Sequence, residues 1–414
     1  MSKSILIKLI PILLVPFIFL CSCEKDNANN NGSKTLAEEI LESGKGLRIG
    51  VAVADINPIN DIGTVLEGYG LRNATGTHDS LTGRALIMMD DSTVIALLSL
   101  DLTGINRMQV YSLKTLIGKS TGIAYDNIFI HATHTHSAPT MVGPGVDYNY
   151  LTYLFDAVNN ATLDALITTK NATPILKKGV ADVGAINRRN PSQILKNEYT
   201  LIEFHGSDNK NIATLLNYSC HPVVLGPNNY KITADYVHYL RNEIEAELGG
   251  TAMFFNGSYG NINPPTTRTN YPYDRSMGTF AKSEKMGVEL ANKMINEFTI
   301  QDTLDIQISS ITKEGNYLGN SASFSVLNLG EIQIAMIPGE PLELFGQQVM
   351  GLFPGPYKIV FGSTNDFIAY IIPGHDWQQC TSSFTGECFE ETLSDENLAP
   401  ILLQGFEEIS SELF

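Results

Sequence analysis

The sequence is short of basic residues. It has 27 lysines and arginines against 44 aspartates and glutamates, which gives a formal net charge of −17 at pH 7. A chain this acidic repels phosphate backbones, so nucleic acid is a poor partner for it. Its glycine-rich segment at residues 256–264 lacks the lysine of a phosphate-binding loop. No internal repeat is present, which argues against a repeat architecture.

Cysteine is also scarce, with five in 414 residues. Cys380 and Cys388 lie eight positions apart in a loop rich in Gly, Ser and Thr, so they could pair in an oxidising compartment. Cys220 lies in an apolar segment next to a histidine. The spacing leaves the pairing of Cys380 with Cys388 open.

The amino-terminal segment has the order of a bacterial lipoprotein signal. Two lysines precede the apolar run 9–20, which is too short for a spanning helix of ~20 residues. The following Leu20-Cys21-Ser22-Cys23 resembles a lipobox, with Cys23 as the lipidated first residue of the mature chain. Removing residues 1–22 removes two lysines and no acid, so the charge becomes −17 − 2 = −19. We therefore expect a signal peptide at 1–22 and a cell-envelope lipoprotein, at the outer membrane or cell surface.

Residues 24–34 are polar and carry no large apolar side chain. Residues 23–46 are therefore expected to be a flexible tether, with the folded part starting near Thr35 or Leu47. The rest of the chain, 47–414, is long enough for two ordinary domains or for one large α/β unit. The sequence does not indicate an oligomeric state.

Apolar, β-branched runs alternate with segments of helical periodicity along the chain. We expect the α/β class, with mixed β-sheets flanked by helices. Helices are expected at 107–120, 150–168, 235–248 and 283–298, and at the carboxyl terminus. Strands are expected at 47–58, 82–89, 93–100, 178–186, 199–204, 212–219, 253–255, 331–337 and 360–372.

Three of the eight histidines lie within six residues, in the segment I-F-I-H-A-T-H-T-H that starts at Ile128. Its apolar and β-branched residues favour an extended backbone, in which residues i and i+2 point to the same face. His134 and His136 would then project together, with His131 on the opposite face. Neutral imidazole is a common zinc ligand. The pattern therefore predicts either half of a zinc site or a hydrogen-bonded polar strand end.

Other polar residues stand where apolar strands are expected to end. Asp101 follows one such strand, His221 follows another and is fixed by Pro222, and Glu340 occupies a Pro-Gly-Glu turn. Glu340 could serve the same site or cap the next helix. Arg188 and the adjacent Arg189 lie in a turn and belong either to the site or to a solvated loop. We expect the strand ends near residues 101, 134, 221, 258 and 340 to converge on one pocket.

Taken together, these landmarks resemble the neutral/alkaline non-lysosomal ceramidases over nearly the whole span from Arg48 to the carboxyl terminus. The order of the motifs carries the resemblance. They are Asp55-Ile56-Asn57-Pro58, Gly68-Tyr69-Gly70, Arg84-Ala85, Thr133 to Ser137, Asn187-Arg188, His221-Pro222, Asp235, Gly260 to Pro264, Pro338 to Glu340 and Tyr370.

The resemblance implies a single zinc ion held by four residues: His134, His221, Glu340 and Tyr370. It implies that His136 donates and accepts the proton at the reacting amide and that Arg188 stabilises the oxyanion. These roles come from the family and not from the spacing of the residues.

Two features depart from the family. Its ceramidases carry a serine in the glycine-rich loop that faces the scissile amide, and the corresponding Ser258 is displaced here by one place. Ser258 is still the candidate for that hydroxyl. The chain also ends at Phe414, without the immunoglobulin-like carboxyl-terminal domain of the long members.

The expected function is zinc-dependent hydrolysis of the amide bond of an N-acyl, ceramide-like substrate. The first alternative is a surface-anchored lipoprotein that binds a lipid or glycan through a degenerate hydrolase site. The second is a zinc esterase. The sequence does not choose the acyl chain or the head group.

Overall fold

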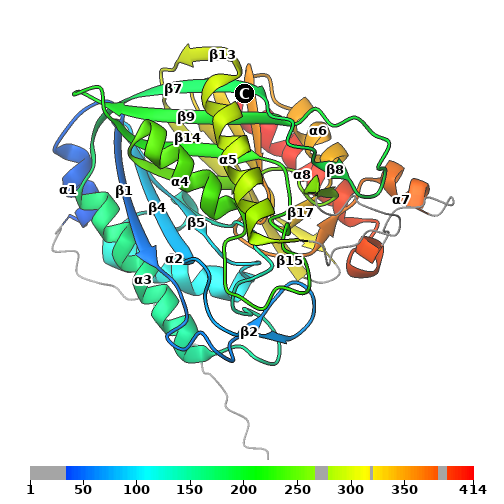
Figure 1. Ribbon diagram of the computed structural model, residues 1–414. Coiled ribbons are helices and arrows are strands. Elements are labelled where there is room, and N and C mark those ends of the chain that lie inside the picture. The colour runs from blue at the N-terminus through cyan, green and yellow to red at the C-terminus, as the bar shows by residue number, and fades with distance from the viewer. Residues whose placement is uncertain (1–33, 266–277, 318–319, 381–388) are drawn as a thin grey trace, which may run out of the picture. The chain divides into compact units, whose positions relative to one another are not determined.

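Two β-sheets packed face to face, each covered by helices on its outer side, make up the fold (Figure 1). The computed structural model describes residues 34–265, 278–317, 320–380 and 389–414. The expected class, α/β with mixed sheets flanked by helices, is confirmed.

The larger sheet has nine strands in the order β11-β10-β9-β7-β1-β4-β5-β6, with β13 paired to β7. The β5/β6 and β10/β11 pairs are parallel and the other neighbours are antiparallel. The strands are β1 (Arg48–Asp55), β4 (Thr82–Met89), β5 (Val94–Leu100), β6 (Ile128–Ala132), β7 (Lys170–Val180), β9 (Glu198–Gly206), β10 (Asn211–Tyr218), β11 (Thr251–Asn256) and β13 (Phe298–Thr303).

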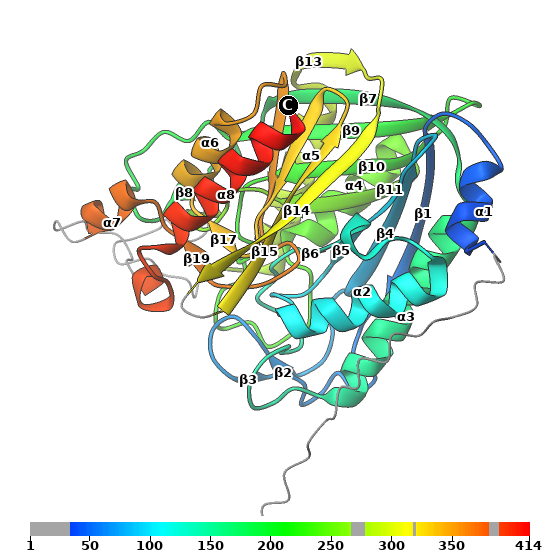
Figure 2. The same ribbon diagram turned by 180° about the vertical axis from the view of Figure 1, so that it is seen from behind.

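The second sheet has the order β14-β15-β16-β18, and its hairpin β14–β15 lies nearest the viewer together with α8 in Figure 2. Its strands are β14 (Ile308–Tyr317), β15 (Asn320–Leu329), β16 (Ile332–Met336) and β18 (Tyr357–Phe361). Three short pairs complete the β-structure: β2 (Val65–Leu66) with β3 (Arg72–Asn73), β8 (Ile186–Asn187) with β12 (Ile262–Asn263), and β17 (Glu340–Pro341) with β19 (Tyr370–Ile371).

Helices cover the outer faces of both sheets. Those on the larger sheet pack through two apolar clusters, and α6 and α8 pack on the second sheet. They are α1 (Leu36–Glu42), α2 (Arg107–Thr121), α3 (Tyr148–Ile167), α4 (Tyr236–Leu248), α5 (Phe280–Asn296), α6 (Glu343–Gly351), α7 (Gly374–Cys380) and α8 (Leu398–Leu413), with short 3₁₀ turns η1 (Tyr125–Asn127) and η4 (Phe389–Leu393). Within the described residues, none of these helices is both long enough and apolar enough to cross a membrane.

The core shows why the central strands read as continuous apolar runs. In β4, Ala85 and Ile87 pack towards the helices, whereas Leu86 and Met88 pack against the second sheet. Side chains of a strand alternate between its two faces, so a strand covered on both sides is mostly apolar on both of them. The burial of β5 along its whole length has the same cause.

Part of the tether expected at 23–46 is folded. Residues 36–42, inside the segment 23–46, form helix α1. Thr35 and Glu38 make a capping box at its start, and Arg48 donates to two carbonyls of its last turn at 2.7 and 2.8 Å. The folded unit therefore begins at Thr35. The Cys380–Cys388 pair and the segment 1–33 lie outside what can be described.

Two expected strands are also wrong. The strand expected at 178–186 is not one strand, because β7 ends at Val180 and β8 starts at Ile186. Residues 360–372 were expected to be a single strand, but β18 ends at Phe361 and β19 starts at Tyr370. Between them Ser363, Asn365 and Ala369 have positive φ values of 43°, 64° and 82°. Left-handed residues cannot continue a strand, so the segment between the two strands forms a loop.

Candidate metal centre

The loop after β6 places two of the clustered histidines. β6 ends at Ala132, so the expected strand through His136 is wrong. The N–H groups of Thr133 and His134 bond to the carbonyls of Leu100 and Leu102, each at 2.9 Å, and this turns the chain around the end of β5. His134 has a φ of 71°, which residues other than glycine rarely adopt. The loop, and not strand alternation, brings His134 and His136 to one place.

His131 lies apart from them, as expected, inside β6. Its Nδ1 is 2.7 Å from the carbonyl oxygen of Gly362, and its ring lies 5.1 Å from that of Phe255. Burial lowers the pKa of His131 to about 3, so it is a neutral core residue.

A third histidine joins the pair from a distant part of the chain. His221 follows β10, and the ligating nitrogens of His134, His136 and His221 all lie within 4.8 Å of one another. The rings of His134 and His221 are 5.1 Å apart. This convergence is compatible with a metal site.

Backbone carbonyls fix two of the three imidazoles. His134 Nδ1 is 2.6 Å from the carbonyl oxygen of Thr103, and His221 Nδ1 is 3.1 Å from that of Ile262. Each Nδ1 must donate to its carbonyl, so in the neutral ring the lone pair is on Nε2 and faces the cluster, which is the tautomer that metal-ligating histidines use. His136 Nδ1 is buried and has no hydrogen-bond partner among the described residues. The three histidines are therefore not equivalent.

Glu340 brings a carboxylate to the same point. Its Oε2 lies 3.0 Å from His221 Nε2 and 3.4 Å from His134 Nε2, while His136 Nε2 lies 3.0 Å from His134 Nε2. A carboxylate and two Nε2 lone pairs repel one another unless protons or a cation lie between them. The residues present thus fit a metal ion with nitrogen and oxygen ligands.

The electrostatics of the cluster agree with this arrangement. Burial alone would raise the pKa of Glu340, but His134 and His221 outweigh it and hold that pKa well below its usual range. Burial, and then the charge of Arg188, lowers the pKa of His221 to about 4. Near neutral pH the cluster therefore combines an ionised carboxylate with neutral His221, which is the state that binds a metal.

Strand pairing sets Glu340 beside Tyr370. The two residues are direct partners in the parallel pair β17/β19, so their side chains leave the sheet on the same face. Helix α6 starts three residues later and its N-cap is Leu342, so the alternative in which Glu340 caps that helix is wrong. Burial raises the pKa of Tyr370, so its hydroxyl is protonated near neutral pH.

Arg188 lies buried beside Tyr370. Its guanidinium donates from Nε to Glu390, from Nη1 to Asn263 and from Nη2 to the carbonyl of Gly260, at 2.8, 3.2 and 2.7 Å, and it also bonds to the Tyr370 hydroxyl. Burial lowers the pKa of Arg188, but Tyr370 and Glu390 outweigh it and leave that pKa raised. The neighbouring Arg189 shares Glu390 with Arg188 and also pairs with Glu391.

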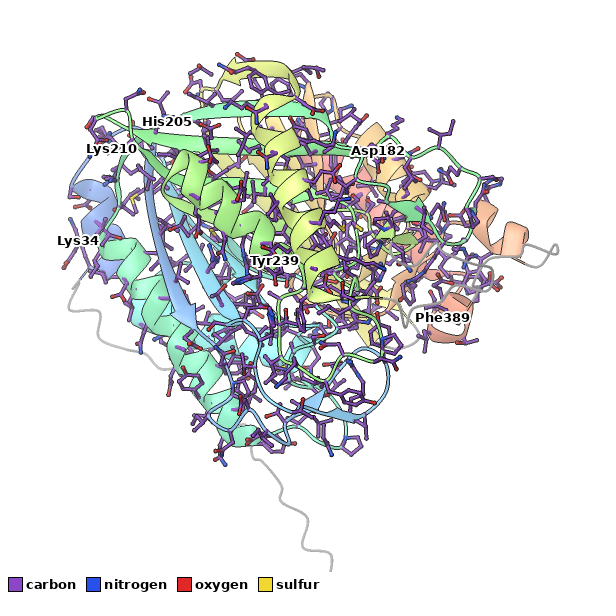
Figure 3. The ribbon with its side chains drawn as sticks, in the orientation of Figure 1. Lys34, Asp182, His205, Lys210, Tyr239 and Phe389 are labelled. Carbon is purple, nitrogen blue, oxygen red and sulfur yellow. The ribbon has the colours of Figure 1, made fainter. Side chains whose placement is uncertain are left out.

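These groups line one cavity of about 450 Å³. One wall is apolar and includes residues from η4, of which Phe389 is labelled in Figure 3. The lining residues are Glu67, Gly68, Tyr69, Gly70, Thr103, His134, His136, Arg188, His221, Val223, Asn263, Glu340, Phe367, Tyr370, Phe389 and Leu393. Six of the seven site residues expected from the sequence are among them.

Solved structures provide an independent comparison. The chain is similar to the neutral ceramidase from Pseudomonas aeruginosa, with a TM-score of 0.76, 14% sequence identity, and coverage of 89% of this chain and 75% of that chain. A ceramidase complexed with C2 matches with the same TM-score and coverage at 13% identity. The chain has a neutral ceramidase-like fold. No family model matches the sequence, and identity this low shows the fold alone.

Ser258 is the expected residue that this ceramidase-like fold does not bring to the cavity. It lines a separate pocket of about 110 Å³. Its Oγ is buried, has no partner in the described parts of the chain, and points at Gly346 of α6, where a Cβ would lie only 1.7 Å from it. Asn263, five residues further on in the same loop, lines the cavity instead.

Two contacts of the metal centre were not expected from the sequence. The ring of Tyr259 packs 4.9 Å from that of His134 and 4.8 Å from that of His221, and its hydroxyl bonds to Ser363. Gly68 has a φ of 106°, and a Cβ there would lie 2.4 Å from Cγ of His136. The Gly-Tyr motif could have suggested the second contact, since glycine permits such a close approach.

Asp101 stabilises the histidine loop from outside the cavity, so the expectation that it joins the pocket is wrong. Its two carboxylate oxygens accept hydrogen bonds from the guanidinium of Arg241 at 2.9 and 2.7 Å, and Oδ1 also accepts one from Thr133 at 3.2 Å. Both charged side chains are almost completely buried. The pair therefore holds the loop that carries His134.

Replacing Arg241 by methionine is expected to lower the free energy of unfolding by about 3–5 kcal/mol, because it leaves the buried Asp101 without its counter-ion. Urea denaturation measures this. The matched control is Lys293→Met, which removes the exposed i,i+4 pair with Glu297 and should cost about 0.5 kcal/mol or less. Equal losses in the two variants would contradict a special role for the buried pair.

Proposed function

We propose that this protein is a zinc-dependent hydrolase that cleaves the amide bond of an N-acyl substrate of the ceramide type. The observation that carries the proposal is the convergence of His134, His221 and Glu340 in a cavity of a ceramidase-like fold. Nitrogen and oxygen donors of this kind are typical of zinc sites.

His134, His221 and Glu340 would hold the ion, with Tyr370 as the fourth ligand. Tyr370 is the strand partner of Glu340 and lines the same cavity. Zinc, when bound, supplies a Lewis acid that lowers the pKa of a water to about 7. The Arg188 guanidinium opposes the burial that raises the pKa of Tyr370, so it favours the ionised hydroxyl that a metal ligand requires.

His136 would carry the proton of the reaction. It lines the cavity, but no backbone carbonyl fixes its Nδ1, unlike those of His134 and His221. Burial, and then His134 and His221, holds the pKa of His136 well below its ordinary value, so the ring is neutral near pH 7 and can accept a proton.

The cavity suits a substrate with an apolar part. Val223, Phe367, Phe389 and Leu393 form an apolar side, whereas Glu67 supplies a carboxylate. The ceramidase likeness supports a lipid substrate. A zinc esterase would use the same ligands, and a binding lipoprotein would keep the cavity without turnover.

A substrate screen with a chelator control separates these functions. Purified protein is assayed against matched N-acyl amides and esters before chelation, after chelation and after zinc is restored. Amide cleavage that is lost on chelation and recovered with zinc supports the proposal. Cleavage of esters alone favours the esterase, and the absence of both stoichiometric zinc and turnover favours the binding protein.

We also propose that the mature chain is anchored in the cell envelope by a lipid on Cys23, which rests on the lysines, apolar run and lipobox of residues 1–23. Cys23→Ala is expected to release the protein from the membrane fraction or to leave it unprocessed. Fractionation and the mass of the amino terminus measure this. Unchanged membrane retention of the variant would contradict a lipid anchor at this position.

A further inference from the structure

We propose that the side-chain NH₂ of Asn263 donates a hydrogen bond to the carbonyl oxygen of the scissile bond. This inference rests on the proposed function and adds to it a residue that contacts the substrate. The cavity that holds the three histidines also contains Asn263, whose side chain had no role in the site expected from the sequence.

The backbone places Asn263 next to the metal centre. It pairs with Ile186 in the β8/β12 ladder, and the preceding residue, Ile262, accepts both the N–H and the Nδ1–H of His221, at 3.0 and 3.1 Å. A shift of Asn263 would therefore shift the carbonyl that orients His221. This gives Asn263 the fixed position that a group stabilising a transition state needs.

Arg188 fixes the orientation of the Asn263 amide. Arg188 Nη1 lies 3.2 Å from Asn263 Oδ1, and a guanidinium has only donors, so the amide oxygen must face it. The NH₂ group then points away from Arg188. Among the described residues it has no acceptor, although only 2% of Asn263 is exposed. An amide donor that lines a cavity and lacks a protein partner is a donor for a ligand.

Arg188 itself has little donor capacity left for a substrate. A guanidinium carries five N–H donors, and Arg188 spends its Nε–H on Glu390, one N–H each on Asn263 and Gly260, and a further contact on Tyr370. The hydroxyl of Thr103, another cavity residue, donates to the carbonyl of Thr135 at 2.7 Å. The hydrogen bond from Arg188 polarises the Asn263 amide, which makes its NH₂ a stronger donor to the substrate.

The proposed step needs no additional reagent. When a water oxygen forms its bond to the carbonyl carbon, the water gives one proton to His136, the π electron pair of the carbonyl moves onto its oxygen, and Asn263 donates to that negative oxygen. When the C–N bond breaks, the electron pair returns and the amine leaves with a proton supplied by His136. The products are a carboxylic acid and an amine, and Asn263 is unchanged.

Asn263→Asp tests the donor directly. The aspartate keeps an oxygen for Arg188 but replaces the NH₂ by an acceptor, so zinc content and Tm should stay close to those of the wild-type protein. Removing one donor from an oxyanion site typically lowers kcat by about 10²–10³-fold, and we expect that loss with a small change in KM. Asn263→Leu removes the donor without adding charge and should lower kcat by a similar factor.

The matched control is Asn261→Asp. Asn261 lies in the same loop, and its Oδ1 accepts the N–H of Glu343 at 2.9 Å, an acceptor that aspartate retains. It does not line the cavity. This variant adds the same negative charge two residues away and should keep its kcat, which separates loss of the donor from the effect of a charge in the loop.

A second readout does not depend on turnover. An N-acyl amide labelled with ¹³C at its carbonyl is bound to zinc-free protein, and its infrared carbonyl stretch is recorded. A hydrogen bond from Asn263 lowers this frequency, so the wild-type protein should give a lower value than Asn263→Leu.

The outcomes separate the two proposals. Full kcat in both Asn263 variants, or identical carbonyl frequencies, would overturn the role of Asn263 while leaving amide hydrolysis in place. If kcat falls in Asn263→Asp and not in Asn263→Leu, the added charge is the cause, and the role of Asn263 as a donor is overturned as well. A wild-type protein that holds zinc and cleaves no amide would overturn the proposed function, and the inference with it.

Discussion

The His221→Ala variant is expected to lose both bound zinc and amide hydrolysis. His221 is buried and its Nε2 lies 3.0 Å from Glu340 Oε2, so its loss removes one ligand and leaves the carboxylate without its nearest partner. Zinc per chain, measured by mass spectrometry after dialysis, should fall from one to near zero. Turnover of the amide found in the screen should fall to the background rate.

His205→Ala is the matched control for this variant. His205 lies on β9, far from Phe389 in Figure 3, and its Nε2 pairs with Glu203 at 2.7 Å. Both zinc content and turnover should survive its loss. A His221→Ala protein that stays folded and keeps a full complement of zinc would show that the ion, if any, is bound elsewhere.

The His136→Ala variant is expected to retain zinc and to lose turnover by about 10²–10⁴-fold, the usual contribution of general acid–base assistance. The reason is the orphan Nδ1 of His136, since the two proposed ligands both have their Nδ1 fixed by a carbonyl. Zinc content and kcat are measured on the same preparation. Added imidazole should restore part of kcat, because the missing ring leaves a space beside Gly68.

The opposite result would change the ligand set. His136 Nε2 lies 3.0 Å from His134 Nε2, close enough for a three-histidine site. If His136→Ala loses zinc as completely as His221→Ala, then His136 is a ligand. Tyr370, whose pKa is raised by burial, would then lose its place as the fourth ligand.

Local sequence patterns predicted the elements of the fold well. Helix α2 was expected at 107–120 and spans Arg107–Thr121 because Asn106 caps its start and Gly122, at a φ of 81°, ends it. Such capping signals are local, so the sequence displays them. The prediction of one strand at 360–372 failed because the loop inside that segment depends on three positive φ values at residues other than glycine, which tertiary contacts impose.

For the site, too, the sequence predicted some features and could not predict others. The expected residues His134, His221 and Glu340 do converge, although His134 reaches the site through a left-handed loop residue and not through a strand. Placement of the glycine-rich loop could not be predicted, because a shift of a few residues decides whether Ser258 or Asn263 faces the cavity. Packing against α6 decides which residue faces the cavity, because the Ser258 side chain lies against Gly346 of that helix.

Anomalous diffraction at the zinc edge, from crystals grown with zinc, tests the central claim most directly. The account predicts one strong peak per chain between His134 Nε2, His221 Nε2 and Glu340 Oε2, at about 2.0–2.2 Å from each, with the Tyr370 oxygen completing the site. A zinc-loaded crystal with no peak at this point, or with its peak outside the cavity, would contradict the account.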